Sequence, residues 1–333
     1  MDKISNNLFP PELIADSVHT QEELDEALAQ HSHLSVTLVT IAVSRPETRK
    51  WYEDYWQKLY KYLDKDFANN FQLESEHEAR AWEFHIASVL FDHGLSLQEK
   101  TWTTGPDFCV LAADGKKVWI EAISCTSGAV DPVPPKPILT EGIIYMSGGN
   151  IEDLNRPRVL RILNAIGTKY EKYKRYISDN NCGVSKDDCL IIAVSGANIE
   201  FASYSDMLLK RAVFGVGPDV FYKDRDTDKL VGPFYTATPT ITKKAKAGDE
   251  VMPASFMEMD EFSNISAVLY CGHHAYDCVL NGHKVGDDFL FAYHSDAKNP
   301  VPEGLFKFGH GIRKNLQDSM VTDKPQTYQF HEL

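Results

Sequence analysis

The chain has 333 residues, of which 43% are hydrophobic, 11% aromatic and 25% charged, a composition typical of a soluble globular protein. It excludes a disordered, collagen-like or coiled-coil main architecture, and no run approaches the roughly 18 consecutive apolar residues of a membrane-spanning helix. The opening sequence MDKISNNLFPPELIADS lacks the apolar core and cleavage site of a secretory signal. We therefore expect a cytoplasmic protein without a membrane partner.

Acidic residues outnumber basic ones, with 48 Asp and Glu against 34 Lys and Arg, and the net charge is −14. A protein that coats nucleic acid with its whole surface needs clustered cations, so this total excludes that class. A nucleic-acid enzyme with a local basic groove is compatible with it. The positions of the basic residues are therefore more informative than their number.

The N-terminal residues 1–73 predict an elaboration made of short elements. Residues 21–30 (QEELDEALAQ) predict a surface helix, and residues 34–43 (LSVTLVTIAV) predict a buried strand because the run is apolar and rich in β-branched residues. The Trp- and Tyr-rich stretch from Trp51 to Phe71 predicts a helix. We expect its aromatic side chains to lie in the core rather than to form a platform that stacks bases.

Residues 74–93 (ESEHEARAWEFHIASVLFDH) predict an amphipathic helix that ends at Gly94, a common helix stop. At about 100° per residue, one apolar face carries Ala79, Trp82, Ile86, Val89 and Leu90. Two carboxylates flank this face, Glu83 at one margin and Glu78 at the other. Either acid can therefore serve a site beside the packed face of the helix.

A meander of three strands is predicted next, at residues 95–102, 108–113 and 117–123. Asp114-Gly115 between the last two strands is a hairpin turn signal. After a Pro- and Gly-rich loop at about 126–155, a helix is expected from about Arg156 to Ile177, capped by Asn155. The continuous apolar run 189–196 then predicts a strand at the centre of a sheet that is covered on both faces.

The remaining residues, 197–333, predict a C-terminal elaboration. It is expected to contain polar loops around 223–250, apolar strands at 265–271 and 289–293, and a short tail after the 299–302 loop. No clear linker divides the chain. Residues 1–333 therefore predict a single α/β domain whose core spans residues 74–196.

Glu121 lies inside the otherwise apolar strand VWIEAI. A buried, unpaired carboxylate costs several kcal/mol, so such a group is normally paired or holds a metal, although a satisfied core glutamate explains Glu121 alone. Asp107 begins the preceding strand, and pairing about Asp114-Gly115 brings both carboxylates to one end of the sheet; alone, Asp107 reads as a turn cap. Neighbouring carboxylates repel each other unless a cation lies between them, and oxygen ligands suit Mg²⁺ or Mn²⁺.

The helix with Trp82-Glu83, the segment Gly105-Pro106-Asp107 and the strand with Glu121-Ala122-Ile123 resemble the PD-(D/E)xK nuclease superfamily, which has the restriction-endonuclease-like fold. The resemblance covers about residues 74–196 and includes the order of helix, three strands, helix and strand. It implies a mixed sheet between helices, with Asp107 and Glu121 as the metal-binding acids. It also implies that Glu83 supports the metal or its waters, and Glu78 is the rival for that role.

The family's lysine would fall at position 123, where this chain has Ile. The helix expected after the motif offers substitutes, because seven basic residues between 156 and 175 stand against one acid. Four of them fall within roughly an 80° arc: Arg158, Arg161, Lys169 and Lys172. We expect Lys169 to replace the family lysine and the other three to hold the phosphate backbone. An ordinary solvated helix face is the alternative, and Lys100 and Lys117 are further stand-ins.

These residues predict a metal-dependent phosphodiester hydrolase that uses Mg²⁺ or Mn²⁺ and acts on nucleic acid, DNA in preference to RNA, in phage defence, restriction or repair. The alternative is a catalytically inactive protein of the same fold that binds nucleic acid or a protein partner. Ile123 and the acidic net charge favour this alternative. Self-association into a homodimer is compatible with both.

The six cysteines show no disulfide framework and are expected to be reduced and buried. The segment from Cys271 to Cys278 also contains His273 and His274, with His283 beyond it, but its spacing matches no compact zinc pattern. We therefore expect core thiols and surface histidines here rather than zinc. A hydrolase built on this segment is a further class, which no Gly-x-Ser-x-Gly elbow or paired nucleophile supports.

Overall fold

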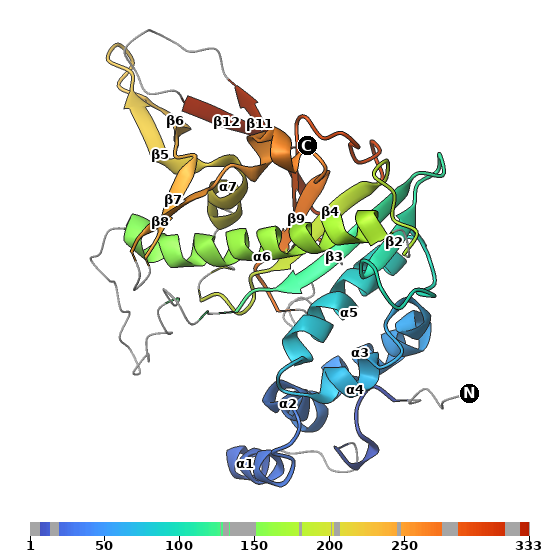
Figure 1. Ribbon diagram of the computed structural model, residues 1–333. Coiled ribbons are helices and arrows are strands. Elements are labelled where there is room, and N and C mark those ends of the chain that lie inside the picture. The colour runs from blue at the N-terminus through green and yellow to red at the C-terminus, as the bar shows by residue number, and fades with distance from the viewer. Residues whose placement is uncertain are drawn as a thin grey trace.

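The structure is a computed structural model. It describes residues 7–13, 20–126, 128, 133, 151–179, 182–200, 202, 207–244, 248–274, 286–316 and 327–332. A large mixed sheet forms its centre and helices lie against both faces of that sheet (Figure 1). The predicted α/β class is therefore confirmed.

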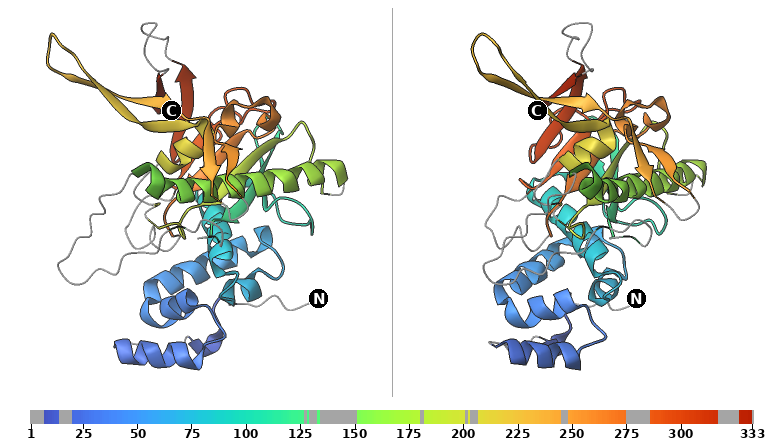
Figure 2. Two further views of the ribbon diagram at one scale, coloured as in Figure 1. Left: turned by 60° about the vertical axis from the view of Figure 1, so that its left-hand side comes forward. Right: turned by 90° about the vertical axis from the view of Figure 1, so that its left-hand side faces the viewer.

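Short helices make up the N-terminal region, drawn in blue at one side of the sheet in Figures 1 and 2. They are α1 (Gln21–Gln30), α2 (Val36–Ser44), α3 (Pro46–Leu59) and α4 (Phe67–Gln72), with 3₁₀ turns at Pro11–Leu13 and Tyr60–Tyr62. Tyr52, Phe67 and Phe71 have no exposed surface, whereas Tyr60 is 41% exposed. The aromatic stretch is thus mainly core, as predicted, although it forms α3 and α4 rather than one helix.

The predicted buried strand at residues 34–43 is wrong, because this run forms helix α2. The Ser35 hydroxyl accepts a hydrogen bond from the Leu38 N–H and caps the first turn. None of the described strands pairs with this segment. A short apolar run has the same sequence pattern in a buried helix as in a buried strand, so periodicity could not separate the two.

Helix α5 (His77–Asp92) connects the N-terminal helices to the sheet. Every residue from Ala81 to Leu90 is buried, so α5 is covered on more sides than its predicted apolar face requires. The Trp82 indole N–H donates to the Ala193 carbonyl oxygen at 3.1 Å, which fixes the helix to the centre of the sheet. Gly94 follows the helix with φ of 67°, a conformation that glycine adopts without strain.

Strands β1 (Ser96–Leu97), β2 (Phe108–Leu111) and β3 (Lys117–Ser124) form the expected antiparallel meander, although the first strand is much shorter than predicted. Helix α6 (Ile151–Asp179) crosses the sheet next (Figure 1), and β4 (Cys189–Ser195) pairs parallel to β3. The predicted cap Asn155 lies inside α6, because the helix begins earlier, at Ile151. Two separate apolar cores result, one between the sheet and α5 and the other between the sheet and α6.

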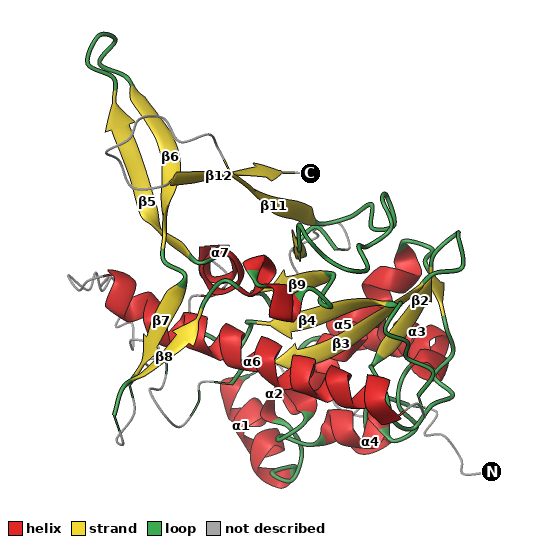
Figure 3. Cartoon of the chain, turned by 45° about the horizontal axis from the view of Figure 1, so that its top comes forward, coloured by secondary structure: helices red, strands yellow, loops and turns green. Residues whose placement is uncertain are grey.

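The C-terminal part extends the same sheet. Its elements are α7 (Met207–Phe214), β5 (Val216–Lys223), β6 (Leu230–Ala237), β7 (Thr240–Lys243), β8 (Glu250–Pro253), β9 (Ala267–Cys271), β10 (Leu290–Tyr293), β11 (His310–Leu316) and β12 (Thr327–Glu332), with 3₁₀ turns at Phe256–Glu258 and Asp260–Phe262. The strand order is β1-β2-β3-β4-β9-β10-β11-β12-β6-β5, and β7 and β8 form a separate pair. Figure 3 shows the long β5–β6 hairpin projecting from the body of the molecule.

The predicted polar loops around 223–250 are wrong over most of their length, and the tail predicted after residue 302 contains β11 and β12. Strands β5 and β6 pair along their length, and the Asp224 carboxylate holds the turn by accepting from the Asp226 and Thr227 N–H groups. These two strands, of which β5 lies at the edge of the sheet, are held by cross-strand backbone hydrogen bonds. An alternating apolar pattern is therefore not required, and none marks them in the sequence.

Candidate active site

Asp107 and Glu121 lie opposite each other in the β2–β3 hairpin. The register pairs Phe108 with Ile120, and continuing it by one residue places Asp107 across from Glu121. Because side chains alternate along a strand and Trp119 belongs to the core under α6, Glu121 faces α6, and Asp107 lies beside it in the bend that precedes β2. The juxtaposition expected from the hairpin turn is therefore present.

Asp107 is fixed against β3 by a backbone contact. Its Oδ2 accepts a hydrogen bond from the Ala122 N–H at 2.7 Å. Its Oδ1 lies 3.9 Å from Lys100 Nζ, too far for a hydrogen bond. One oxygen thus orients the carboxylate, while the other forms a long ion pair with Lys100 and no hydrogen bond that the described residues show.

Glu121 is fully buried, and α6 supplies its cations. Oε1 accepts hydrogen bonds from Lys169 Nζ at 2.7 Å and from Lys172 Nζ at 2.9 Å. Oε2 is buried and has no hydrogen-bond partner among the described residues. A buried oxygen without a partner costs about 1–3 kcal/mol, so Oε2 is the atom of this site that most needs a ligand.

The ionisation of this pair is set by burial and by neighbouring charge. Burial, followed by the charge of Asp107, raises the pKa of Glu121, and the two lysines oppose the rise. Burial alone would lower the pKa of Lys172, but Glu121 and Tyr176 raise it above its usual value. Both lysines therefore stabilise the carboxylate form that a metal ion requires.

Glu83 approaches Asp107 from α5. Its two oxygens lie 3.1 and 2.8 Å from Arg80 Nη1. Burial and the charge of Asp107 raise the pKa of Glu83 to about 8, against the opposing effects of Arg80 and Lys100. Asp64 joins the two cations, since its carboxylate lies 3.3 Å from Arg80 Nη1 and 2.8 Å from Lys100 Nζ.

Glu78, the rival of Glu83, has a different environment. Its Oε2 lies 3.2 Å from His274 Nδ1. Burial opposes its ionisation, but the bond to His274 and the charges of the nearby histidines lower the pKa of Glu78. Of the two acids, only Glu83 interacts with Asp107.

The two other candidate lysines also differ in whether they lie beside the acids of the site. Lys100 lies beside Asp107, as described above, but Lys117 donates to the Gly183 carbonyl oxygen at 3.2 Å and lies over the Trp119 ring. Ile123 lies on the same face of β3 as Glu121 and packs against the core under α6. The position that holds lysine in the family that the sequence resembles is therefore apolar here, and Lys169 of α6 contacts Glu121 on the same face of β3.

The two arginines expected to hold phosphate also differ. Arg158 is only 6% exposed, and its guanidinium donates to the carbonyl oxygens of Leu154 and Glu200. It therefore supports α6 and its surroundings, which argues against the expected phosphate contact. Arg161 is half-buried, donates to the Pro157 carbonyl oxygen of its own helix and packs against Gly128 in the segment that follows β3.

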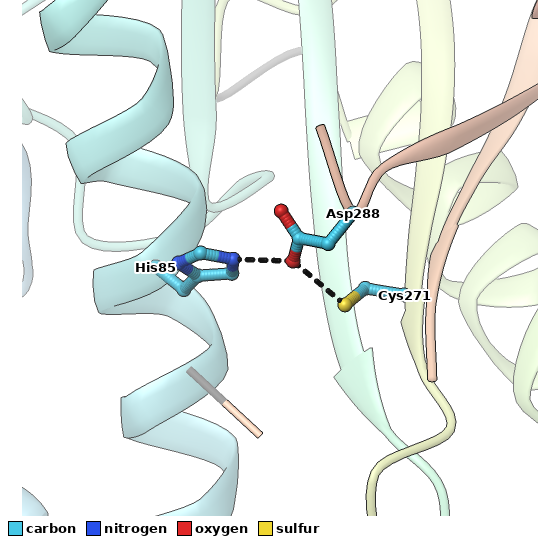
Figure 4. A group of neighbouring side chains, drawn as sticks. All are labelled: His85, Cys271 and Asp288. Carbon is cyan, nitrogen blue, oxygen red and sulfur yellow. Dashed lines mark hydrogen bonds and ion pairs between the residues drawn. The ribbon is translucent and has the colours of Figure 1, made fainter. Parts of the chain in front are cut away.

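A second cluster was not foreseen from the sequence. His85, Cys271 and Asp288 offer ligand atoms that lie within 4.8 Å of one another (Figure 4). The sequence pattern marks the segment that contains Cys271 as a possible metal site. No local pattern links His85 to Asp288, because 203 positions separate them. Cys278 and His283 lie outside the described residues. The five described cysteines are buried, as expected, and form no disulfide bond with one another.

Comparisons with known proteins identify no relative: no protein-family model, curated protein or solved structure matches the chain. Within the described residues, no helix has both the length and the apolar character needed to cross a bilayer. The function must therefore be inferred from the geometry of the site.

Proposed function

We propose that the chain is a metal-dependent nuclease that acts on DNA, built on a restriction-endonuclease-like core. The order of α5, the antiparallel β1–β2–β3 meander, α6 and the parallel strand β4 supports this fold. One observation carries the functional proposal. Lys169 of α6 contacts Glu121 beside Asp107, and so brings a cation to the place where Ile123 replaces the lysine of the resembling family.

The acids fit a divalent cation with oxygen ligands. Glu121 Oε2 is a buried oxygen without a hydrogen bond among the described residues, and Asp107 Oδ1 has only its long ion pair. Carboxylate oxygens are the preferred ligands of Mg²⁺ and Mn²⁺. When bound, such an ion lowers the pKa of a water molecule and neutralises charge on the phosphate.

The surrounding residues have separate roles in this proposal. Lys169 is held at the acids by Glu121 and stabilises negative charge that develops on the phosphate oxygens in the transition state. Lys172 and Arg161 bind the nucleic-acid backbone, and Lys172 is the more accessible lysine, with 45% of its side chain exposed. Glu83, oriented by Arg80, accepts hydrogen bonds from water at the site.

A second candidate function rests on the charge balance of the cluster. Four acids, Asp64, Glu83, Asp107 and Glu121, interact with four bases, Arg80, Lys100, Lys169 and Lys172. Each of these acids already has a cationic partner without any bound metal ion, although the charges do not cancel exactly, because Glu76 also lies 3.9 Å from Arg80 and the pKa of Glu83 is raised to about 8. This favours the alternative of a non-catalytic protein of the same fold that binds nucleic acid or a protein.

Calorimetric titration with Mn²⁺ separates the two candidates. The nuclease proposal predicts binding by the wild type that weakens at least about tenfold in Glu121→Gln, as expected when a ligand is lost. Glu78→Gln is the matched control, because Glu78 pairs with His274 and not with the acids of the site. Unchanged binding in Glu121→Gln, or no binding by the wild type, contradicts the proposal.

A further inference from the structure

Three side chains of different chemical types meet on the far side of α5 from Glu83. His85 comes from the helix, Cys271 ends β9, and Asp288 lies in the turn before β10 (Figure 4). His85 Nε2 and Cys271 Sγ lie 2.8 and 3.0 Å from the same oxygen, Asp288 Oδ2. All three side chains are nearly or fully buried.

Hydrogen bonding leaves this cluster incomplete. Asp288 accepts from both neighbours, but His85 Nδ1 is buried and has no hydrogen-bond partner among the described residues. The order of contacts also argues against a cysteine nucleophile. The carboxylate of Asp288 lies between the thiol and the imidazole, whereas activation of a thiol requires the imidazole next to the sulfur.

The same three atoms match the ligands and the spacing of a zinc site. Zinc binds Cys sulfur, His nitrogen and Asp oxygen at about 2.0–2.3 Å, and tetrahedral geometry then separates the ligand atoms by roughly 3.3–3.8 Å. Two of the present separations, 2.8 and 3.0 Å, lie just below that range, and all three are within 4.8 Å. Small movements are therefore enough to admit the ion once the thiol has lost its proton.

We propose that His85, Cys271 and Asp288 bind one zinc ion that joins α5 to β9 and to the turn before β10, with water in the fourth position. The inference is independent of the proposed nuclease activity, because a thiolate selects zinc whereas the all-oxygen acids select magnesium or manganese. It reverses the expectation drawn from the 271–283 spacing, since two of the ligands lie outside that segment.

Cobalt(II) tests the site directly, because it replaces zinc and gives a sulfur-to-metal charge-transfer band only when a thiolate is bound. The wild type should bind about one equivalent of zinc and show this band with cobalt. Cys271→Ala should abolish the band and weaken zinc binding at least about tenfold. Asp288→Asn keeps the shape of the side chain and an oxygen for His85, so it should fold and also weaken zinc binding.

Two controls make the result specific. Cys109→Ala removes a buried thiol from β2 outside the cluster, and Glu121→Gln alters the other proposed metal site. Both variants should keep the cobalt band and the zinc equivalent. A wild type that gives no band, or a zinc equivalent that survives Cys271→Ala, overturns the proposal and leaves a hydrogen-bonded triad.

Discussion

Lys169 and Glu121 are 48 positions apart in the sequence, yet Lys169 Nζ donates to Glu121 Oε1 at 2.7 Å. The contact joins α6 to β3 at the carboxylate that faces Asp107. Ile123, on the same face of β3, supplies apolar packing instead of charge. The helix can therefore provide the cation that the strand lacks, which is the basis of the first prediction.

Lys169→Ala should lower the turnover rate on DNA roughly 100-fold while DNA affinity changes little. An interaction used mainly in the transition state affects kcat rather than substrate binding. Steady-state rates and a separate binding titration measure the two effects. Lys174→Ala is the matched control on α6, because Lys174 is paired with Glu171 away from the acids. Weaker binding with an unchanged rate would make Lys169 a phosphate contact only.

Arg161→Ala should have the opposite profile. Loss of one phosphate contact should weaken binding to all sequences and reduce the slope of log affinity against log salt by about one. The turnover rate at saturating DNA should stay close to that of the wild type. Binding measured at several salt concentrations tests this, and an unchanged slope would exclude a contact between Arg161 and phosphate.

Glu121→Ala should destabilise the protein in the absence of metal. The sequence alone suggests the reverse, because removing one of two neighbouring carboxylates relieves repulsion. In the structure, however, Lys169 and Lys172 both lose their acceptor. Breaking a buried pair costs about 3–5 kcal/mol, and the 45% exposure of Lys172 places the expected loss toward the lower end. Urea unfolding of the wild type and of Glu121→Ala, both in the presence of a chelator, measures whether the unfolding free energy falls or rises.

Glu83 should make the folded protein less stable as the pH rises. Its pKa is about 8 in the folded state against 4.5 ordinarily, so between these values the folded state binds more protons than the unfolded state. The unfolding free energy therefore falls with increasing pH, by at most about 1.4 kcal/mol per unit from this group. Glu83→Gln should flatten the dependence. Equal pH slopes for the two proteins would contradict the assigned shift.

Metal binding should depend on pH with the opposite sign. A proton on Glu121 competes with the cation, and burial together with Asp107 raises the pKa of this carboxyl. Mn²⁺ affinity should therefore increase as the pH rises through that raised pKa. Mn²⁺ titrations at several pH values measure this dependence. An affinity independent of pH would show that Mn²⁺ does not displace a proton from Glu121.

The core of the fold could be predicted from the sequence because local sequence patterns mark its turns and helices. Asp114-Gly115 fixes the centre of the hairpin, and that centre determines that Asp107 and Glu121 face each other. Lys169 was also readable, since helical periodicity places it beside the apolar face of α6. The structure of residues 34–43 could not be predicted, because a short apolar run fits a buried helix as well as a buried strand.

Other features depend on contacts that no local pattern records. The buried environment of Arg158 follows from its bonds to the Leu154 and Glu200 carbonyls, and its helix position alone suggested an exposed cation. Similarly, the cluster of His85, Cys271 and Asp288 forms only when α5, β9 and the turn before β10 come together. Sequence reasoning found one of its three members.

Cleavage of DNA by the wild type in Mn²⁺, with Glu121→Gln assayed alongside, tests whether the chain is a metal-dependent nuclease. The wild type should hydrolyse phosphodiester bonds, chelation should stop the reaction, and Glu121→Gln should be inactive although folded. A wild type that binds nucleic acid but cleaves neither DNA nor RNA in manganese would contradict the nuclease proposal. The cluster of paired acids and bases would then belong to a binding protein.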